Sequence, residues 1–183
     1  MALLAEEIVE EWLNRNGYFT IRGIKVGLYE IDLLAIRKTG SEIERRHIEV
    51  QASFRPVGYI TPLPKQVQKE TGRAPYNARK RSHKELEAGV QEWVHSKFLM
   101  QQKCELRESL YPGKWRYELV VNIVRHPEEL VYIEKQGVKI LHLSNIIAEL
   151  SSSKTCIKSA AGGDLVELVM LQAEQSLPTA AGQ

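Results

Sequence analysis

Cysteine is scarce in this chain of 183 residues, which contains only Cys104 and Cys156. Two cysteines so far apart give neither a disulfide framework nor the spacing of a zinc site, and we therefore expect a reducing, cytoplasmic setting. The first residues lack the basic segment of a signal peptide and turn acidic at once. No apolar run approaches the length that crosses a bilayer. These absences argue against both a disulfide-rich scaffold and a membrane protein.

Charge of one sign is not in excess over the whole chain, because the formal net charge is only +2. The charge is nevertheless uneven, since the segment from Arg55 to Lys84 contains eight Lys or Arg residues and one Glu. A basic segment of this kind suits a polyanion such as a nucleic acid. A solvated basic face without any partner has the same composition. Hydrophobic residues make up 43% of the chain, which is enough for the core of one ordinary domain.

Hydrophobic periodicity and turn residues predict an alternation of helices and strands. Helices are expected over 3–15, 65–71, 81–103, 127–135 and 144–150, and strands over 18–26, 29–37, 47–54, 115–125 and 138–143. This order predicts a mixed sheet with helices packed on it, in the α/β or α+β class. We expect one domain over residues 1–150, a linker over 151–163, and a C-terminal helix and tail over 164–183.

Acidic residues interrupt the two strands between Tyr29 and Phe54, although Asp and Glu are poor strand formers. Lys38 to Ser41 has the composition of a turn, so the two strands are expected to pair as an antiparallel hairpin. With a turn near residues 38–46, Asp32 lies roughly across from Gln51, and Glu49 is its neighbour. Side chains two apart share a face of a strand. The hairpin therefore predicts two carboxylates and an amide at one place, which suits a hard divalent cation.

The same residues also allow an alternative interpretation in which their role is purely structural. Asp32 is then a polar residue at the edge of the sheet, and Glu49 pairs with Arg22 or Arg37.

The order of these motifs resembles the PD-(D/E)XK nuclease superfamily, which has the restriction-endonuclease-like fold. The resemblance is greatest to the archaeal-type Holliday-junction resolvases and their relatives. In this sequence the matching segments are Ala5-Glu6 leading to Gly17-Tyr18, then Glu30 to Ala35, then Ile48 to Gln51. The resemblance covers residues 5–54 by motif and the remainder only by the order of elements.

The resemblance implies a metal-dependent endonuclease. Asp32 and Glu49 would bind Mg²⁺ or Mn²⁺, with the Val50 carbonyl as a backbone ligand and Glu6 as an additional acid beside the metal. A bound cation of this kind lowers the pKa of water and stabilises charge on the scissile phosphate.

Gln51 departs from the family pattern, which usually has lysine at this position. Glutamine can hydrogen-bond the attacking water but carries no charge. Some active restriction enzymes have a similar E-x-Q motif, so the residue is compatible with activity. In other relatives the lysine comes from the following helix, and Lys65 or Lys69 is the candidate here. Gln51 is equally compatible with a site that no longer cuts.

The basic residues that follow the second acidic strand are candidates for nucleic-acid binding, because phosphate contacts give affinity without sequence readout. We select Arg55, Lys65, Lys69, Arg79, Lys80 and Arg81, with Tyr59 as the aromatic residue to place against a base. The sequence thus predicts a nuclease that acts on DNA and resembles families that often form homodimers. The alternatives are a non-cleaving nucleic-acid-binding module on the same fold and an assembly protein that docks through its C-terminal helix.

Overall fold

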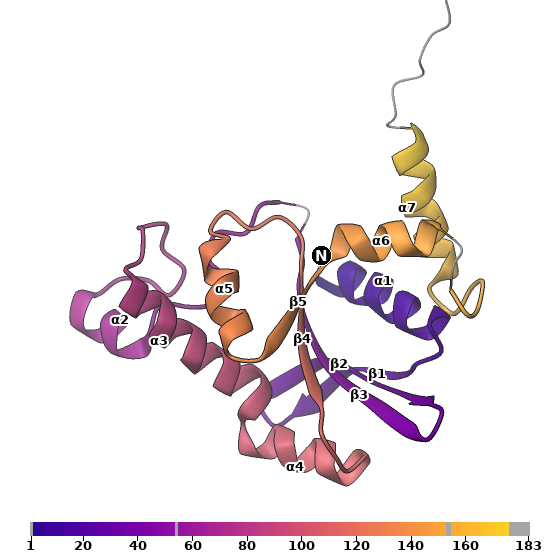
Figure 1. Ribbon diagram of the computed structural model, residues 1–183. Helices are drawn as coiled ribbons and strands as arrows, with labels where there is room; N and C mark the ends of the chain where they lie inside the picture. Colours follow the sequence, from indigo (N-terminus) through magenta and orange to yellow (C-terminus); the bar gives the residue numbers. More distant parts are fainter. Residues whose placement is uncertain (1, 54, 153–154, 176–183) are drawn as a thin grey trace, which may run out of the picture.

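The computed structural model describes residues 2–53, 55–152 and 155–175. Its centre is a mixed five-stranded sheet with strand order β1-β2-β3-β4-β5 (Figure 1). The first three strands, β1 (Phe19–Val26), β2 (Tyr29–Thr39) and β3 (Glu42–Gln51), form an antiparallel meander. The last two, β4 (Arg116–Val121) and β5 (Val138–His142), run parallel to β3. The predicted mixed α/β class is confirmed.

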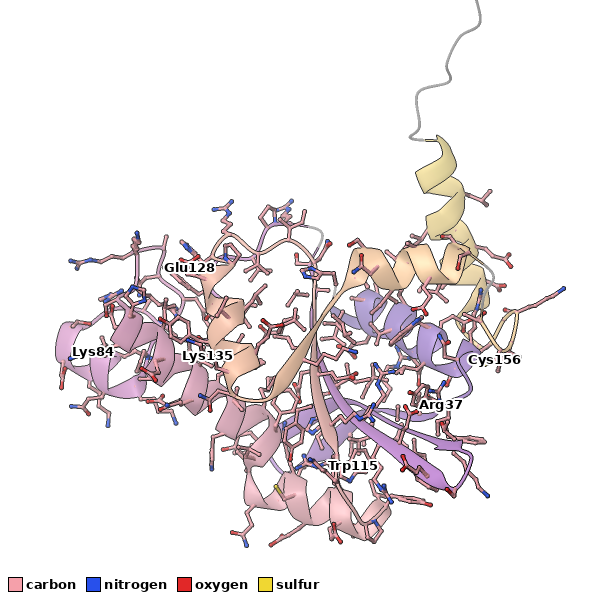
Figure 2. All side chains as sticks on the ribbon, viewed as in Figure 1. Arg37, Lys84, Trp115, Glu128, Lys135 and Cys156 are labelled. Atoms are coloured by element: carbon pink, nitrogen blue, oxygen red, sulfur yellow. The ribbon has the colours of Figure 1, made fainter. Side chains whose placement is uncertain are left out.

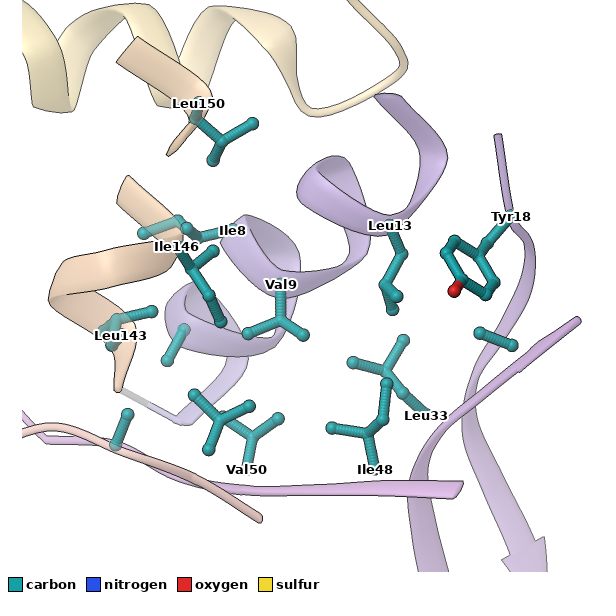
Figure 3. Packing of buried hydrophobic residues seen from close by; sticks show 14 of the residues in the cluster. Ile8, Val9, Leu13, Tyr18, Leu33, Ile48, Val50, Leu143, Ile146 and Leu150 are labelled. Atoms are coloured by element: carbon teal, nitrogen blue, oxygen red, sulfur yellow. The ribbon is translucent and has the colours of Figure 1, made fainter. Parts of the chain in front are cut away.

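One face of the sheet is covered by α1 (Ala2–Arg15) and α6 (Leu143–Ser151) (Figure 1). The apolar stripe of α1, which includes Ile8 and Leu13, packs on the inward side chains of β2 and β3, such as Leu33 and Ile48 (Figure 3). Because side chains alternate along a strand, the residues between these positions point to the opposite face. Glu49 is therefore turned away from α1, and its lysine partners come from the opposite face.

The opposite face is covered by α3 (His83–Val94), a π-helical turn η1 (His95–Leu99), α4 (Gln101–Leu110) and α5 (Glu128–Lys135). The continuous helix predicted over residues 81–103 is wrong in its second half, because the chain widens into the π turn and then becomes extended at Met100. Ser82 and Glu85 form the expected capping box at its start. After the interruption, α4 packs against β2 and β3 through Leu106, Lys103 and Arg107.

Two further segments lie at the periphery. The short helix α2 (Lys65–Thr71) lies beside α3 (Figure 1), and its first amide, that of Lys65, donates to Glu92 in the last turn of α3. At the C-terminal side, residues 155–163 pack along α1, where the amides of Ala160 and Gly162 both donate to the Glu11 carboxylate at 2.8 Å. The helix α7 (Gly163–Gln175) follows and adds Val166 to the α1 core. Residues 153–154 and 176–183 of the predicted linker and tail lie outside the described residues.

The register of the β2–β3 hairpin differs from the predicted one. Thr39 pairs with Glu42 across a two-residue turn, and Leu33 consequently pairs with Ile48. Gly40 supplies the positive φ of +62° that a tight hairpin turn requires. The turn is shorter than residues 38–46, so the prediction that Asp32 lies across from Gln51 is wrong. The observed register places Asp32 next to Glu49 instead.

Candidate active site

The candidate site lies where the sheet divides between β2 and β3. Pairing between these strands ends at Leu33 and Ile48, whereas β2 remains paired with β1 as far as Tyr29. β3 in turn remains paired with β4 as far as Gln51. Asp32 and Glu49 are the first residues beyond the last pair on their two strands. The division therefore brings both carboxylates to one opening in the sheet.

Asp32 occupies this opening with one carboxylate oxygen bound and the other available. Its Oδ2 accepts a hydrogen bond of 2.7 Å from the backbone amide of Val50, which gives that N–H a partner where the β2–β3 ladder has ended. Within the described residues, Oδ1 has no hydrogen-bond partner and Asp32 forms no ion pair. Burial and the negative charge of Glu49 raise the pKa of Asp32 to about 7, although Lys97 and the Val50 amide act in the opposite direction.

Glu49 is fully buried and is surrounded by donors. Its Oε2 lies 2.5 Å from the Lys97 ammonium, and its Oε1 lies 3.4 Å from the Lys103 ammonium and 3.1 Å from His47 Nε2. Burial alone would raise the pKa of Glu49, but the His47 hydrogen bond and the two lysine charges lower it below its usual value. Glu49 is thus held as a carboxylate directly beside Asp32, whose pKa is raised to about 7.

His47 is a neutral part of this cluster. Burial lowers the pKa of the imidazole to about 4, so at neutral pH it carries one proton. Arg107 Nη1 lies 2.8 Å from Nδ1 and can only donate, which assigns the His47 proton to Nε2 and directs it at Glu49. His47 therefore orients the Glu49 carboxylate without adding charge.

Two buried cations hold the π turn that carries Lys97. Lys103 Nζ donates to the Lys97 carbonyl at 2.9 Å and to the Glu30 carbonyl at 2.6 Å. Arg107 Nη2 donates to the Phe98 carbonyl at 2.8 Å. The turn is thereby tied both to α4 and to β2. Single π turns within helices occur frequently at functional sites, and this one places a lysine against the carboxylate pair.

The lysine that reaches the carboxylates was not the one predicted. Lys65 and Lys69 are exposed on α2, and neither forms a hydrogen bond or ion pair with Asp32 or Glu49 in the described part of the chain. Lys97 takes this place, and the Glu49 and Asp32 charges raise its pKa against the effect of burial. The sequence does contain a signal for it. Lys97 continues the buried helical stripe at a spacing of four from Trp93, where an apolar residue is the norm.

The contacts contradict the alternative in which Glu49 pairs with Arg22 or Arg37. Arg22 pairs with Glu7 and Glu10 of α1, at 3.3 and 3.0 Å, and Arg37 pairs with Glu44 at 3.1 Å. Figure 2 shows Arg37 on the side of the sheet where α1 ends, and its Nη1 donates to the Asn16 carbonyl there. Neither arginine neutralises Glu49, whose partners are lysines from η1 and α4.

Three other predicted site residues lie around the opening. Glu6 on α1 is electrostatically coupled to both Asp32 and Glu49, and burial together with the Glu30 charge raises its pKa. Val50 contacts Asp32 through its amide, while a metal-ligand role for its carbonyl stays a prediction. Gln51 ends β3, is half-buried and pairs with Val121 on β4. Its proposed contact with the attacking water also stays a prediction.

The donor set suits a cation bound by two carboxylates and water. Within the described residues, no group of three or more His, Cys, Asp or Glu side chains is arranged to hold a metal ion. Mg²⁺ commonly uses only one or two carboxylates and keeps several waters. The available oxygen of Asp32 and the Lys97-facing oxygen of Glu49 fit that pattern. A cation there would offset the repulsion between the two acids.

Most of the predicted nucleic-acid-binding residues are accessible, but one is not. Arg55, Lys65, Lys69, Arg79 and Lys80 are exposed. Arg81 is buried, because its guanidinium donates to the Thr61 carbonyl at 2.8 Å and to the Pro75 carbonyl at 3.0 Å and lies over the Tyr59 ring. The prediction that Arg81 binds phosphate is therefore wrong, since this cation stabilises the loop before α3.

Tyr59 is likewise committed to the interior. It is 5% exposed, and its ring stacks on His126 with the centroids 4.0 Å apart. It is not free to stack on a nucleobase.

Lys84, the last residue of the basic segment, lies near α2, at the end of the molecule away from the sheet (Figure 2).

Comparisons with known proteins assign no activity to this site. No family model matches the sequence, and no curated protein matches it. Among solved structures, the chain is similar to a protein of unknown function, AF1548, with 17% identity and a TM-score of 0.42. The match covers 79% of this chain and 59% of that one. A TM-score this low supports no conclusion about function. Among the described residues, no helix has both the length and the apolar character to span a membrane.

Proposed function

We propose that this protein is a metal-dependent endonuclease that hydrolyses phosphodiester bonds in DNA. The observation that carries the proposal is the convergence of Asp32, Glu49 and Lys97 at the division of the sheet. A buried carboxylate, Glu49, beside a half-buried one, Asp32, is costly unless cations balance both charges. Asp32 forms no ion pair with any residue that the structure describes, and strongly perturbed acids in an opening are typical of functional sites.

The residues would divide the work as follows. Asp32 and Glu49 hold Mg²⁺ or Mn²⁺, with the Val50 carbonyl available as a third ligand. When bound, the cation lowers the pKa of water and neutralises charge on the scissile phosphate. Lys97 retains 27% side-chain exposure, so its ammonium can reach a phosphate oxygen at the mouth of the site. This supplies the positive charge that glutamine at position 51 lacks.

Gln51 and Glu6 support the same chemistry from either side. Gln51 accepts or donates a hydrogen bond and so can orient the attacking water. Glu6 keeps a raised pKa beside the site and can accept a proton once a cation and substrate have changed its surroundings.

The accessible basic residues support DNA as the substrate. Arg55, Lys65, Lys69, Arg79 and Lys80 would contact phosphates, which gives affinity that depends on salt but not on sequence. Cys104 and Cys156 are both free thiols, in keeping with a cytoplasmic location. A homodimer on DNA is part of this proposal.

A cleavage assay tests the proposal. Supercoiled plasmid and branched DNA are incubated with the protein and Mg²⁺ or Mn²⁺, beside Asp32→Asn and Glu49→Gln. Both substitutions keep the size of the side chain, and the side-chain amide oxygen introduced at position 32 can still accept from the Val50 amide. We expect nicking by the wild type and none by either variant. Glu42→Gln, which removes an exposed carboxylate from the same strand β3, is the matched control and should cleave normally.

A second candidate function is favoured by the saturation of Glu49. Its two oxygens already face two ammonium groups and an imidazole N–H, so the carboxylate can serve as an internal counter-ion instead of a metal ligand. The protein would then be a non-cleaving nucleic-acid-binding module. DNA binding that is equal in wild type and both variants, without nicking under any metal condition, would support this function and exclude the nuclease.

A further inference from the structure

A cleft of about 750 Å³ lies beside the candidate site. One wall is the end of α3 and the π turn, with Trp93, His95, Ser96 and Met100. The opposite side comes from α2 and its flanking loops, which include Lys65 and Gln68. Tyr29, at the start of β2, also lines the cleft. The cleft is large enough for one nucleotide and is assembled from three separate parts of the chain.

Two lining residues of the cleft are close in sequence to residues of the candidate site. Ser96 immediately precedes Lys97, and Tyr29 lies three residues before Asp32 on the same strand. Tyr76, an exposed residue of the loop between α2 and α3, is close enough to Lys97 to interact with it electrostatically. A polynucleotide with a phosphate at Lys97 would therefore have its adjacent nucleoside at the cleft.

The lining suits a flat heterocycle better than a phosphate. Tyr29, which is 43% exposed, and Met100 offer apolar surface to a ring, and an aromatic face such as that of Tyr29 stacks on any base. Lys65 and Glu92 both line the cleft, and the negative charge of Glu92 offsets the attraction of Lys65 for phosphate there. One Glu92 oxygen accepts from the Lys65 amide at 3.2 Å, and its other oxygen has no partner in the described part of the chain. That oxygen can accept from an exocyclic amino group, as acids do in base recognition.

We propose that this cleft binds an unpaired nucleobase of the strand that is cut, so that the substrate is single-stranded or locally unpaired DNA. A base within a duplex cannot enter, because its edges and faces are already paired and stacked. This inference rests on the proposed function for its phosphate position, but the cleft itself binds without metal. Binding can therefore be measured separately from cleavage.

The experiment compares three fluorescent probes in EDTA with the full chain: a single-stranded oligonucleotide, the same backbone with abasic nucleotides, and the blunt duplex. Fluorescence anisotropy should show that the single strand binds more tightly than either other probe. Tyr29→Ala should weaken binding of the base-bearing single strand about tenfold, the effect of losing one stacked base. It should leave binding of the abasic probe unchanged.

Phe19→Ala is the matched control, because Phe19 is 80% exposed and lies on β1 outside the cleft. It removes an exposed aromatic ring of similar size and should change neither probe. Cross-linking of an oligonucleotide that contains 5-iodouracil should further map to Tyr29 or Met100 by mass spectrometry.

Equal affinity for the base-bearing and abasic strands, or an equal effect of Tyr29→Ala on both, would overturn the base-binding cleft. Failure of the nuclease proposal gives a different result, namely base-dependent binding in EDTA without cleavage when Mg²⁺ is added.

Discussion

Two buried carboxylates on adjacent strands, Glu118 on β4 and Glu49 on β3, have opposite surroundings. Glu118 Oε2 accepts from Arg46 Nε at 2.7 Å and from Arg46 Nη2 at 2.5 Å. The same guanidinium lies over the rings of Trp12 and Tyr18, 4.8 and 5.0 Å from their centroids. One acid thus meets one base, and aromatic rings of the α1 side cover the pair. This is an arrangement that stabilises the fold and leaves nothing to bind.

Glu49 belongs to a cluster that is not closed in this way. Two lysines and a neutral histidine contact it, and a second acid, Asp32, stands beside it with a pKa near 7 and an oxygen that faces no protein donor among the described residues. The cluster also lies where the β2–β3 pairing stops, whereas Glu118 lies within a continuous ladder. The difference shows what marks a candidate site. In the Glu49 cluster the acids and bases are not matched one to one, and the cluster lies at an opening in the sheet.

After the loss of either acid, removal of Lys97 should give the largest functional effect. We expect Lys97→Met to slow DNA cleavage about a hundredfold to a thousandfold, because a positive charge aimed at the developing charge on phosphate is lost. Single-turnover cleavage measures this. Arg46→Met, which removes the cation of the closed pair, should destabilise the protein yet leave the rate of the folded fraction near that of wild type. Equal loss in both variants would mean that Lys97 acts only through folding.

Removal of the acid from each cluster should lower the free energy of unfolding by different amounts. Glu118→Gln leaves the Arg46 charge buried without its partner, and we expect the free energy of unfolding to fall by about 3–5 kcal/mol. Glu49→Gln should cost less than about 2 kcal/mol, because Lys97 can turn to water, Lys103 keeps two carbonyl acceptors, and Asp32 loses a repelling neighbour. Urea unfolding at pH 7.5 measures both. A larger loss for Glu49→Gln would identify its cluster as the structural one.

Asp32→Asn should stabilise the protein at high pH. The pKa of Asp32 is about 7 in the folded state against an ordinary 3.8. Between these values the unfolded chain releases the proton that the folded protein retains, so this group's contribution to stability falls as pH rises and is lowest above pH 7. We expect the variant to gain about 1–3 kcal/mol at pH 8 and little near pH 4. Urea unfolding at the two pH values measures this. A gain in the free energy of unfolding that does not depend on pH would contradict a raised pKa of Asp32 as its cause.

A divalent cation should lower the pKa of Asp32. We expect saturating Ca²⁺, which supports binding without requiring cleavage, to shift it down by about one unit or more, since each unit corresponds to about 1.4 kcal/mol of preference for the ionised form. Carboxyl-detected NMR titration of labelled protein follows the change. The exposed Glu42 serves as the reference that should not respond. An Asp32 titration that is the same with and without the cation would remove it from the ligand set.

Local residue chemistry predicted most elements of the fold but not the geometry between them. The short helix over 65–71 and the capping box at Ser82 follow from nearby residues and occur as expected. The hairpin register did not follow, because it depends on a turn of two residues at Gly40 that the flanking polar residues conceal. The break at Met100 was missed as well, since no proline or glycine marks it. That break is stabilised by two buried donors of the following helix, Lys103 and Arg107, which bond to the carbonyls of the π turn.

The sequence by itself determined that Asp32 and Glu49 interrupt two apolar strands, because a charge within an alternating pattern is visible without coordinates. Only the tertiary structure decided that Lys97, 48 residues beyond Glu49, completes the cluster, and that Arg81 lies inside the molecule. Contacts of such long separation arise from how helices pack over a sheet, and a one-dimensional pattern records which face a residue takes but not what it meets there.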